Sequence, residues 1–117
     1  MVKAPQTEVE ARKWAREAVI SKSYRAIQHF YDQLAVRGFA VGDALNAIER
    51  ASYCEPYPTT PKQGGTTWRV TGPALDATPH KKATQIRVGI ETYWDDAAGK
   101  RVMLVTLFNP AKHGGKK

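Results

Sequence analysis

A histidine, a glutamine and an arginine are spaced four residues apart in one stretch of the chain, at His29, Gln33 and Arg37, and Gly38 follows directly. If this stretch is helical, the three side chains lie on the same side of the helix, and Arg25 extends the row by one more turn. Histidine titrates near neutral pH, and guanidinium groups make two-point contacts with phosphate oxygens. The row therefore predicts acid–base chemistry next to a phosphate.

The residues required for metal-free RNA cleavage are present in the chain. This reaction needs a base for the 2′-hydroxyl proton, an acid for the leaving oxygen, and cations for the charge that builds on phosphorus. We predict His29 as the acid or base, and Tyr93 as a proton donor or a group that stacks on a nucleobase. The predicted phosphate ligands are Arg37, Arg69 and Arg87. Further contacts with nucleic acid are expected from Lys22, Arg25, Lys81 and Lys82.

Each of these residues also has an ordinary structural interpretation. His29 is equally well explained as a surface histidine of a helix. Arg37 suits the C-terminus of a helix, where a cation satisfies the last carbonyl groups and the helix dipole. Arg69 and Arg87 lie in segments that look like strands, where they could simply face solvent. The three tryptophans are more typical of packing than of base stacking.

No motif for a metal or cofactor is present. The sequence has no paired Cys/His spacing, no His-Glu-x-x-His, no Walker loop and no Gly-x-Ser-x-Gly. Asp95 and Asp96 are explained by a turn. Cys54, the single cysteine, is interpreted as a small buried side chain and cannot form an intramolecular disulfide. We expect no metal and no cofactor.

Composition narrows the class of protein. The 117 residues fit a single domain, with an expected core at about 22–109 and a flexible basic tail at 110–117. A net charge of +7 and a pI near 9.7 favour nucleic acid, an anionic surface or an acidic protein as partner. No segment has the length and apolar character of a signal peptide or a membrane span, so we expect no membrane association and a cytoplasmic location.

The pattern of residues predicts helices first and strands afterwards. Thr7 and Glu10 form a capping box before a helix at 8–20, whose N-terminal position and few large apolar residues indicate a peripheral element. A second helix is expected at 24–37, ended by Gly38, and a short third one from Asp43 to about Tyr53. Residues 54–65, with three prolines and two glycines, predict a long loop.

Three strands are expected in the remainder of the chain. They cover residues 66–71, 84–93 and 102–108, with a hairpin turn at 95–100. Residues 84–93 alternate between apolar and polar, as in a half-buried strand, whereas 102–108 is apolar almost throughout and is expected at the centre of the sheet. The fold class is therefore α+β, with N-terminal helices packed on one face of an antiparallel sheet of three to four strands.

These elements resemble a family. His29, Arg37-Gly38 followed by an apolar residue, Trp68-Arg69-Val70-Thr71-Gly72, and an apolar strand ending Val105-Thr106-Leu107-Phe108 are similar to a small bacterial domain family of unknown function, grouped near the RelE-like and BrnT-like ribonuclease toxins. The resemblance covers residues 22–109. It implies a RelE-like fold and a bacterial toxin that cleaves RNA and is neutralised by an acidic antitoxin or immunity protein.

Two functions remain open from the sequence. The first is a small, basic, metal-independent endoribonuclease of a toxin–antitoxin system. The second is a non-catalytic module that binds nucleic acid or an acidic protein through the same basic surface. Both predict salt-sensitive binding to RNA, and only the first predicts cleavage that depends on His29.

Overall fold

The computed structural model describes residues 4–108 and confirms the α+β class. The expected basic tail at 110–117 lies outside the described residues. Three helices and five strands follow one another along the chain: α1 (Glu8–Ile20), β1 (Tyr24–Ala26), α2 (Gln28–Arg37), α3 (Val41–Glu49), β2 (Tyr53–Pro56), β3 (Thr66–Pro73), β4 (Gln85–Asp95) and β5 (Gly99–Leu107).

The five strands form one mixed sheet in the order β1-β5-β4-β3-β2. The strands β2 to β5 pair antiparallel with their neighbours, and β1 pairs parallel with β5. The expected antiparallel sheet of three to four strands is therefore wrong in two respects, because it lacks β1 and β2. These strands have three and four residues, which is too short for an alternating pattern to be recognised.

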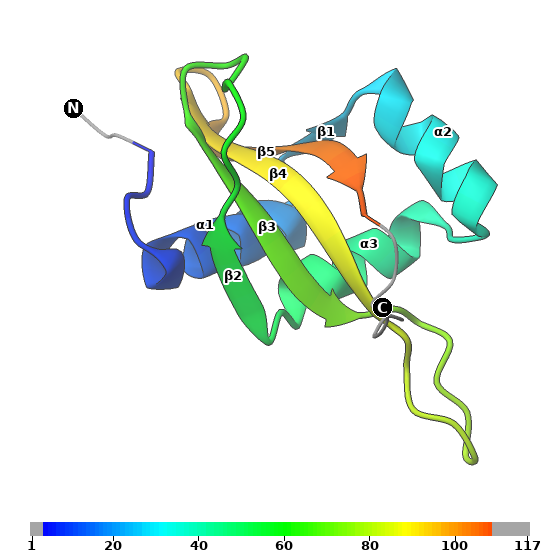
Figure 1. The fold of residues 1–117 in the computed structure, drawn as a ribbon. Helices are drawn as coiled ribbons and strands as arrows, with labels where there is room; N and C mark the ends of the chain where they lie inside the picture. Colours follow the sequence, from blue (N-terminus) through cyan, green and yellow to red (C-terminus); the bar gives the residue numbers. More distant parts are fainter. Residues whose placement is uncertain (1–3, 109–117) are drawn as a thin grey trace.

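The helices lie on one face of the sheet and leave the other face without helical cover (Figure 1). Alternate strand residues such as Val70, Val88 and Leu104 point toward the helices and are fully buried. We call the opposite side the open face. It carries the intervening strand residues, among them Arg69, Arg87 and Glu91.

The central strand is β4, and not β5 as expected. Its residues from Val88 to Tyr93 are buried on both faces, despite the alternating pattern in the sequence. In β5 the apolar run contains a bulge, because Thr106 pairs with Gly89 and Leu104 with Ile90, which leaves Val105 as an extra residue. Glu91 of β4 is buried by a loop on the open face, and a hydrophobicity pattern does not reveal such cover.

Helix α1 belongs to the core, which corrects both its expected peripheral position and the expected core boundary at residue 22. Ala11, Ala15 and Ala18 are almost fully buried, and such small side chains allow a helix backbone to lie close to its neighbours. Trp14 is also buried, and its indole Nε1 donates a hydrogen bond of 3.1 Å to the carbonyl oxygen of Arg101 in β5. The capping box of Thr7 and Glu10 is confirmed.

The second helix begins at Gln28, and not near Tyr24 as expected. The preceding residues form β1, so Arg25 lies on a strand opposite Met103 and is not part of the helical row. The buried residues of α2 are Phe30 and Leu34. Gly38 ends the helix in the left-handed region, with φ of 75°, as predicted.

The third helix also differs from its expected bounds, because it begins at Val41 and ends at Glu49. The carboxylate of Asp43 accepts a hydrogen bond of 2.8 Å from the backbone N–H of Ala40, which explains the earlier start. The expected loop at 54–65 begins later, since its first residues belong to β2.

Candidate functional site

A pair of aromatic rings lies on the open face of the sheet. The rings of Tyr57 and Phe108 meet edge to face, with centroids 5.1 Å apart. They lie over Gly89 of β4, where a Cβ atom would be 3.3 Å from each ring and 2.6 Å from the Thr106 methyl group. A glycine at this position therefore lets both rings approach the sheet closely.

Arg69 of β3 lies against this aromatic pair. Its guanidinium carbon is 5.4 Å from the centroid of the Phe108 ring, within the range of a cation–π contact. Its Nε donates a hydrogen bond of 2.6 Å to a carboxylate oxygen of Glu55 on β2. About a third of the Arg69 side chain stays exposed. The neighbouring groups hold the guanidinium in place while part of it faces solvent.

Arg87 and Arg37 lie near the same end of β5. The backbone N–H of Phe108 donates a hydrogen bond of 2.9 Å to the carbonyl oxygen of Arg87. Arg37, at the end of α2, donates from Nε to the carbonyl oxygen of Leu107 at 3.2 Å. The side chains of Arg69 and Arg37 thus contact Phe108 and Leu107, and Arg87 is a neighbour of Phe108 through its backbone. We call Arg37, Arg69, Arg87, Tyr57 and Phe108 the arginine–aromatic cluster.

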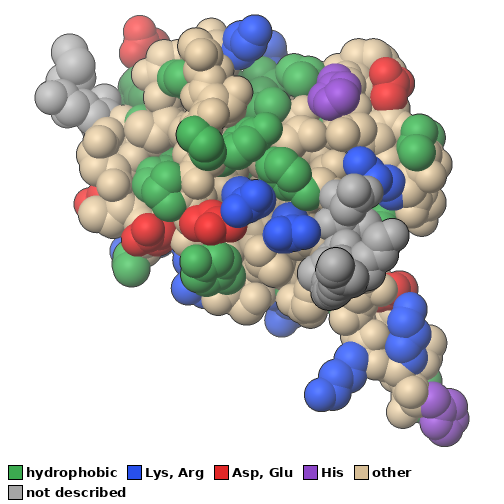
Figure 2. All heavy atoms as spheres, in the orientation of Figure 1, with side chains coloured by type: hydrophobic (Ala, Val, Ile, Leu, Met, Phe, Trp, Pro, Cys, Tyr) green, Lys and Arg blue, Asp and Glu red, His purple; other side chains and the backbone are tan. Residues whose placement is uncertain are grey.

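Figure 2 looks onto the open face and shows Lys and Arg side chains gathered in its middle, beside an acidic side chain and among hydrophobic ones. Such a surface combines positive charge with flat apolar rings. Nucleic acids present negative phosphates and flat bases, so the two sets of groups are complementary.

The helical row that contains His29 contacts the edge of β5. The strand β1 pairs with β5 only from Val102 to Leu104. Beyond it, the side-chain oxygen of Gln33 accepts hydrogen bonds from the backbone N–H of Leu107 at 2.7 Å and from the hydroxyl of Thr106 at 2.6 Å. Gln33 and Arg37 therefore take the place of a paired strand along this part of the edge.

His29 is exposed on α2, one helical turn before Gln33. Because Gln33 reaches Thr106, which lies next to Gly89, this row runs along the rim of the open face. Along the helix axis His29 lies roughly 12 Å from Arg37 at ~1.5 Å per residue. His29 and Arg37 therefore both lie on the rim, whereas Arg69 and Arg87 lie on the open face that the rim borders.

The other predicted site residues lie elsewhere. Tyr93 is buried four residues beyond Gly89 on β4, about 13 Å along the strand at ~3.3 Å per residue, so it does not join the arginine–aromatic cluster. Lys22 lies in the turn after α1, with φ of 62°. Lys81 and Lys82 lie in the β3–β4 connection at 74–84, which projects from the body of the protein (Figure 1).

This β3–β4 connection is held together by Asp76. Its carboxylate accepts hydrogen bonds from the hydroxyl and the backbone N–H of Thr84 at 2.6 and 2.8 Å, and pairs with Lys81 at 2.9 Å. The hydroxyl of Thr84, followed by Lys81, lowers the pKa of this carboxyl group well below its usual range. Lys81 thus has a structural partner within the connection, whereas Lys82 is exposed.

A second carboxylate anchors the loop at 57–65 to the open face. Glu91 of β4 is 1% exposed and accepts hydrogen bonds from the backbone N–H groups of Lys62, Gln63 and Gly65 at 2.7–2.9 Å. Gly65 lies directly against the backbone of β4, because a Cβ atom there would be 1.9 Å from the carbonyl oxygen of Thr92. The loop covers one end of the open face, and its first residue, Tyr57, belongs to the arginine–aromatic cluster.

Sequence reasoning missed four residues of this face: Tyr57, Phe108, Glu55 and Glu91. They come from β2 and the loop after it, from β4 and from the end of β5, so no local spacing connects them. Gly64 and Gly65 are the one available signal, since paired glycines mark a close approach of the backbone. Phe108 was assigned to packing in a strand, whereas its ring lies on the open face.

Within residues 4–108, no group of three or more His, Cys, Asp or Glu side chains is placed to hold a metal ion. None of the helices described here is long and apolar enough to cross a membrane.

Comparison with known proteins gives no relatives for this site. No family model matches the chain, and neither the curated proteins nor the solved structures contain a significant match.

Proposed function

We propose that this protein binds single-stranded RNA on the open face of its sheet, through the arginine–aromatic cluster. The observation that carries the proposal is the Tyr57–Phe108 pair on Gly89 with Arg69 against it. Arg37 contacts the same end of β5 with its side chain and Arg87 lies beside it in β4, which adds positive charge where a phosphate backbone would pass. RNA is the proposed ligand because its single-stranded segments present unstacked bases, which can lie on the partly exposed rings of Tyr57 and Phe108.

Two kinds of contact are expected to provide the free energy of RNA binding: stacking of bases on aromatic rings, and attraction between arginines and phosphates. Stacking of one base on an aromatic side chain contributes about 1–3 kcal/mol. Each phosphate that an arginine neutralises adds a salt-dependent contribution, because counterions are released. Stacking and phosphate contacts do not distinguish one base from another, so this binding is expected to depend weakly on sequence.

Fluorescence anisotropy with a labelled 12-nucleotide RNA of mixed sequence tests the proposal. Phe108→Ala and Arg69→Gln should each weaken binding about 10-fold, since each removes roughly 1–2 kcal/mol of stacking or charge contact. Arg16→Gln, on the helical side of the protein away from the open face, is the matched control and should change the affinity less than 2-fold. Binding should fall as salt rises. Equal losses in Arg16→Gln and Arg69→Gln would show that the RNA is attracted by net charge alone.

Cleavage of the bound RNA is the second candidate function, and the position of His29 favours it. This histidine is exposed on the rim, one turn from the glutamine that contacts Thr106. A bound RNA that runs from the arginine–aromatic cluster toward α2 passes the imidazole of His29. This imidazole can act as the acid or the base when the 2′-hydroxyl attacks phosphorus. In that case the protein is a ribonuclease toxin, and an acidic antitoxin is its expected partner.

The second candidate is tested by product analysis in the presence of a metal chelator. The parent should produce fragments that end in a 2′,3′-cyclic phosphate, and His29→Ala should produce none while it binds RNA with unchanged affinity. His80→Ala is the matched control, because that histidine lies on the projecting β3–β4 connection. Binding without cleavage in the parent would leave the binding function and remove the enzymatic one.

A further inference from the structure

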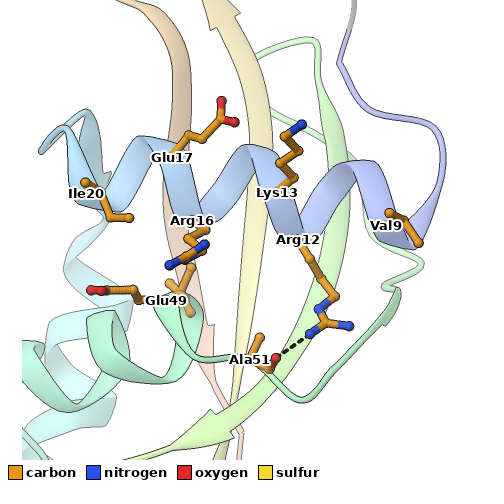
Figure 3. A pocket seen from close by; sticks show the side chains of 9 residues that line it. Val9, Arg12, Lys13, Arg16, Glu17, Ile20, Glu49 and Ala51 are labelled. Carbon is orange, nitrogen blue, oxygen red and sulfur yellow. Dashed lines mark hydrogen bonds between the residues drawn. The ribbon is translucent and has the colours of Figure 1, made fainter.

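The helical side of the protein carries a groove between α1 and the end of α3 (Figure 3). Its volume is about 400 Å³. Arg12 and Arg16 point from α1 toward α3, while Val9 and Ile20 mark the two ends of the groove (Figure 3). The groove lies on the opposite side of the sheet from the arginine–aromatic cluster, so it is a separate surface.

The middle of the groove is positively charged. Arg12, Lys13 and Arg16 line it, and within residues 4–108 none of them forms an ion pair with a carboxylate. Arg12 instead donates a hydrogen bond of 2.6 Å to the carbonyl oxygen of Ala51. Of the two acidic side chains in the lining, Glu17 pairs with Lys100 at 2.7 Å. The positive charge of the three cations is therefore only partly balanced.

The ends of the groove are apolar and exposed. The exposed fractions of Val9 and Ile20 are 75% and 56%, and Ile48 and Ala51 of the α3 side lie between them. Val9 and Ile20 are eleven residues apart on α1, which is three turns and roughly 16 Å. The surface thus presents apolar contacts at both ends of a basic strip.

We propose that this groove binds an acidic amphipathic helix of a partner protein. Carboxylates of the helix would pair with Arg12, Lys13 and Arg16, and its apolar side chains would cover Val9 and Ile20. About three turns of helix match the length of the groove. A nucleic acid fits less well, because its phosphates would face Glu49 and leave the apolar ends in water.

A second copy of this chain is a poor candidate to bind the groove, because its charge is not complementary to the three cations. The surface of α1 is itself basic in its middle, and the only acidic residue of α2 is Asp32, which accepts a hydrogen bond from Gln28. The chain carries a net charge of +7. We therefore expect the complementary charge to come from a different protein.

The test is a selection of random 16-residue peptides, displayed on phage, against the full chain. Enriched peptides should be rich in Asp and Glu and carry Leu or Ile about eleven positions apart. A synthetic enriched peptide, titrated by calorimetry, should bind Arg16→Glu at least 10-fold more weakly than the parent. Lys82→Glu, which makes the same change in charge on the projecting β3–β4 connection, should bind within 2-fold of the parent.

The two proposed surfaces are distinguished by measuring each variant with the ligand of the other surface. Arg69→Gln should retain the peptide, and Arg16→Glu should retain the 12-nucleotide RNA within 3-fold. The proposal is overturned if no peptide is enriched, if Arg16→Glu and Lys82→Glu bind the peptide equally, or if RNA displaces the peptide competitively. It is also overturned if sedimentation shows a dimer that Arg16→Glu dissociates, since the groove would then bind a second copy. Thermal unfolding confirms that each variant is folded.

Discussion

Glu91 is a buried carboxylate that determines where a loop lies. Its two oxygens accept three backbone N–H groups of residues 62–65. A glutamine side chain has one oxygen, so Glu91→Gln leaves at least one of these N–H groups without its acceptor. We expect a loss of about 2 kcal/mol in the free energy of unfolding, measured by urea denaturation. Amide exchange at Lys62, Gln63 and Gly65 should accelerate.

Asp96→Asn is the control for this substitution. It makes the same chemical change in the exposed turn between β4 and β5, and should alter stability by less than about 0.5 kcal/mol. Equal effects of the two substitutions would show that the hydrogen bonds of Glu91 do not hold the loop.

Cys54 gives a prediction about pH. Burial raises the pKa of its thiol to about 12, above the usual value of ~8.5. The neutral thiol is favoured in the folded protein, so the associated stability is complete below pH ~8.5 and is lost as the pH rises toward 12. At neutral pH, Cys54 should not react with Ellman's reagent until the protein is unfolded. Rapid reaction of the native protein would contradict this.

At the scale of elements, Gly72 allows α3 to lie directly on the sheet. A Cβ atom at this position would be 2.1 Å from the carbonyl oxygen of Ala47, and backbone atoms cannot move aside cheaply. Gly72→Ala should therefore destabilise the protein by about 3 kcal/mol, as measured by thermal or urea unfolding.

Gly42→Ala is the matched control for Gly72→Ala. This glycine lies within α3, and its nearest neighbour, a methyl group of Leu75, would be 3.5 Å from the new Cβ atom. Alanine favours helix more than glycine, so a gain of about 0.5–1 kcal/mol is expected. Destabilisation by both substitutions would indicate that α3 tolerates no added side chain anywhere.

The elements that sequence analysis predicted well are those with strong local signals. The capping box begins α1, Gly38 ends α2, and Gly99 closes the turn before β5 with φ of 78°. The strands β1 and β2 were missed because they are too short to show a pattern, and β1 in addition pairs with a strand far along the chain. Arg37 and Arg69 were predicted as parts of one phosphate site; their contacts with Leu107 and Phe108 at the end of β5 were visible only in the fold.

At the scale of the whole molecule, the protein is a layer of helices on a sheet with two unlike outer surfaces. Trp14 connects the layers, because it is buried on α1 and hydrogen-bonded to β5. Trp14→Ala should lower the free energy of unfolding by about 3–5 kcal/mol, as for other large buried aromatic residues. Trp94, 41% exposed and edge to face with Trp14, is the control and should cost about 1 kcal/mol when replaced by alanine. A loss of only about 1 kcal/mol for Trp14→Ala, as small as that of the control, would contradict the core position of α1.

The contact of α1 and β1 with β5 has a consequence for synthesis of the chain. Residues Tyr24–Ala26 pair with Val102–Leu104, so β1 cannot pair until β5 has been synthesised. At roughly 5–20 residues per second, a ribosome adds the intervening segment in about 4–15 s. During that interval the apolar side of α1 has no sheet to cover it. A nascent chain in this state is a natural client for chaperones that bind exposed apolar helices.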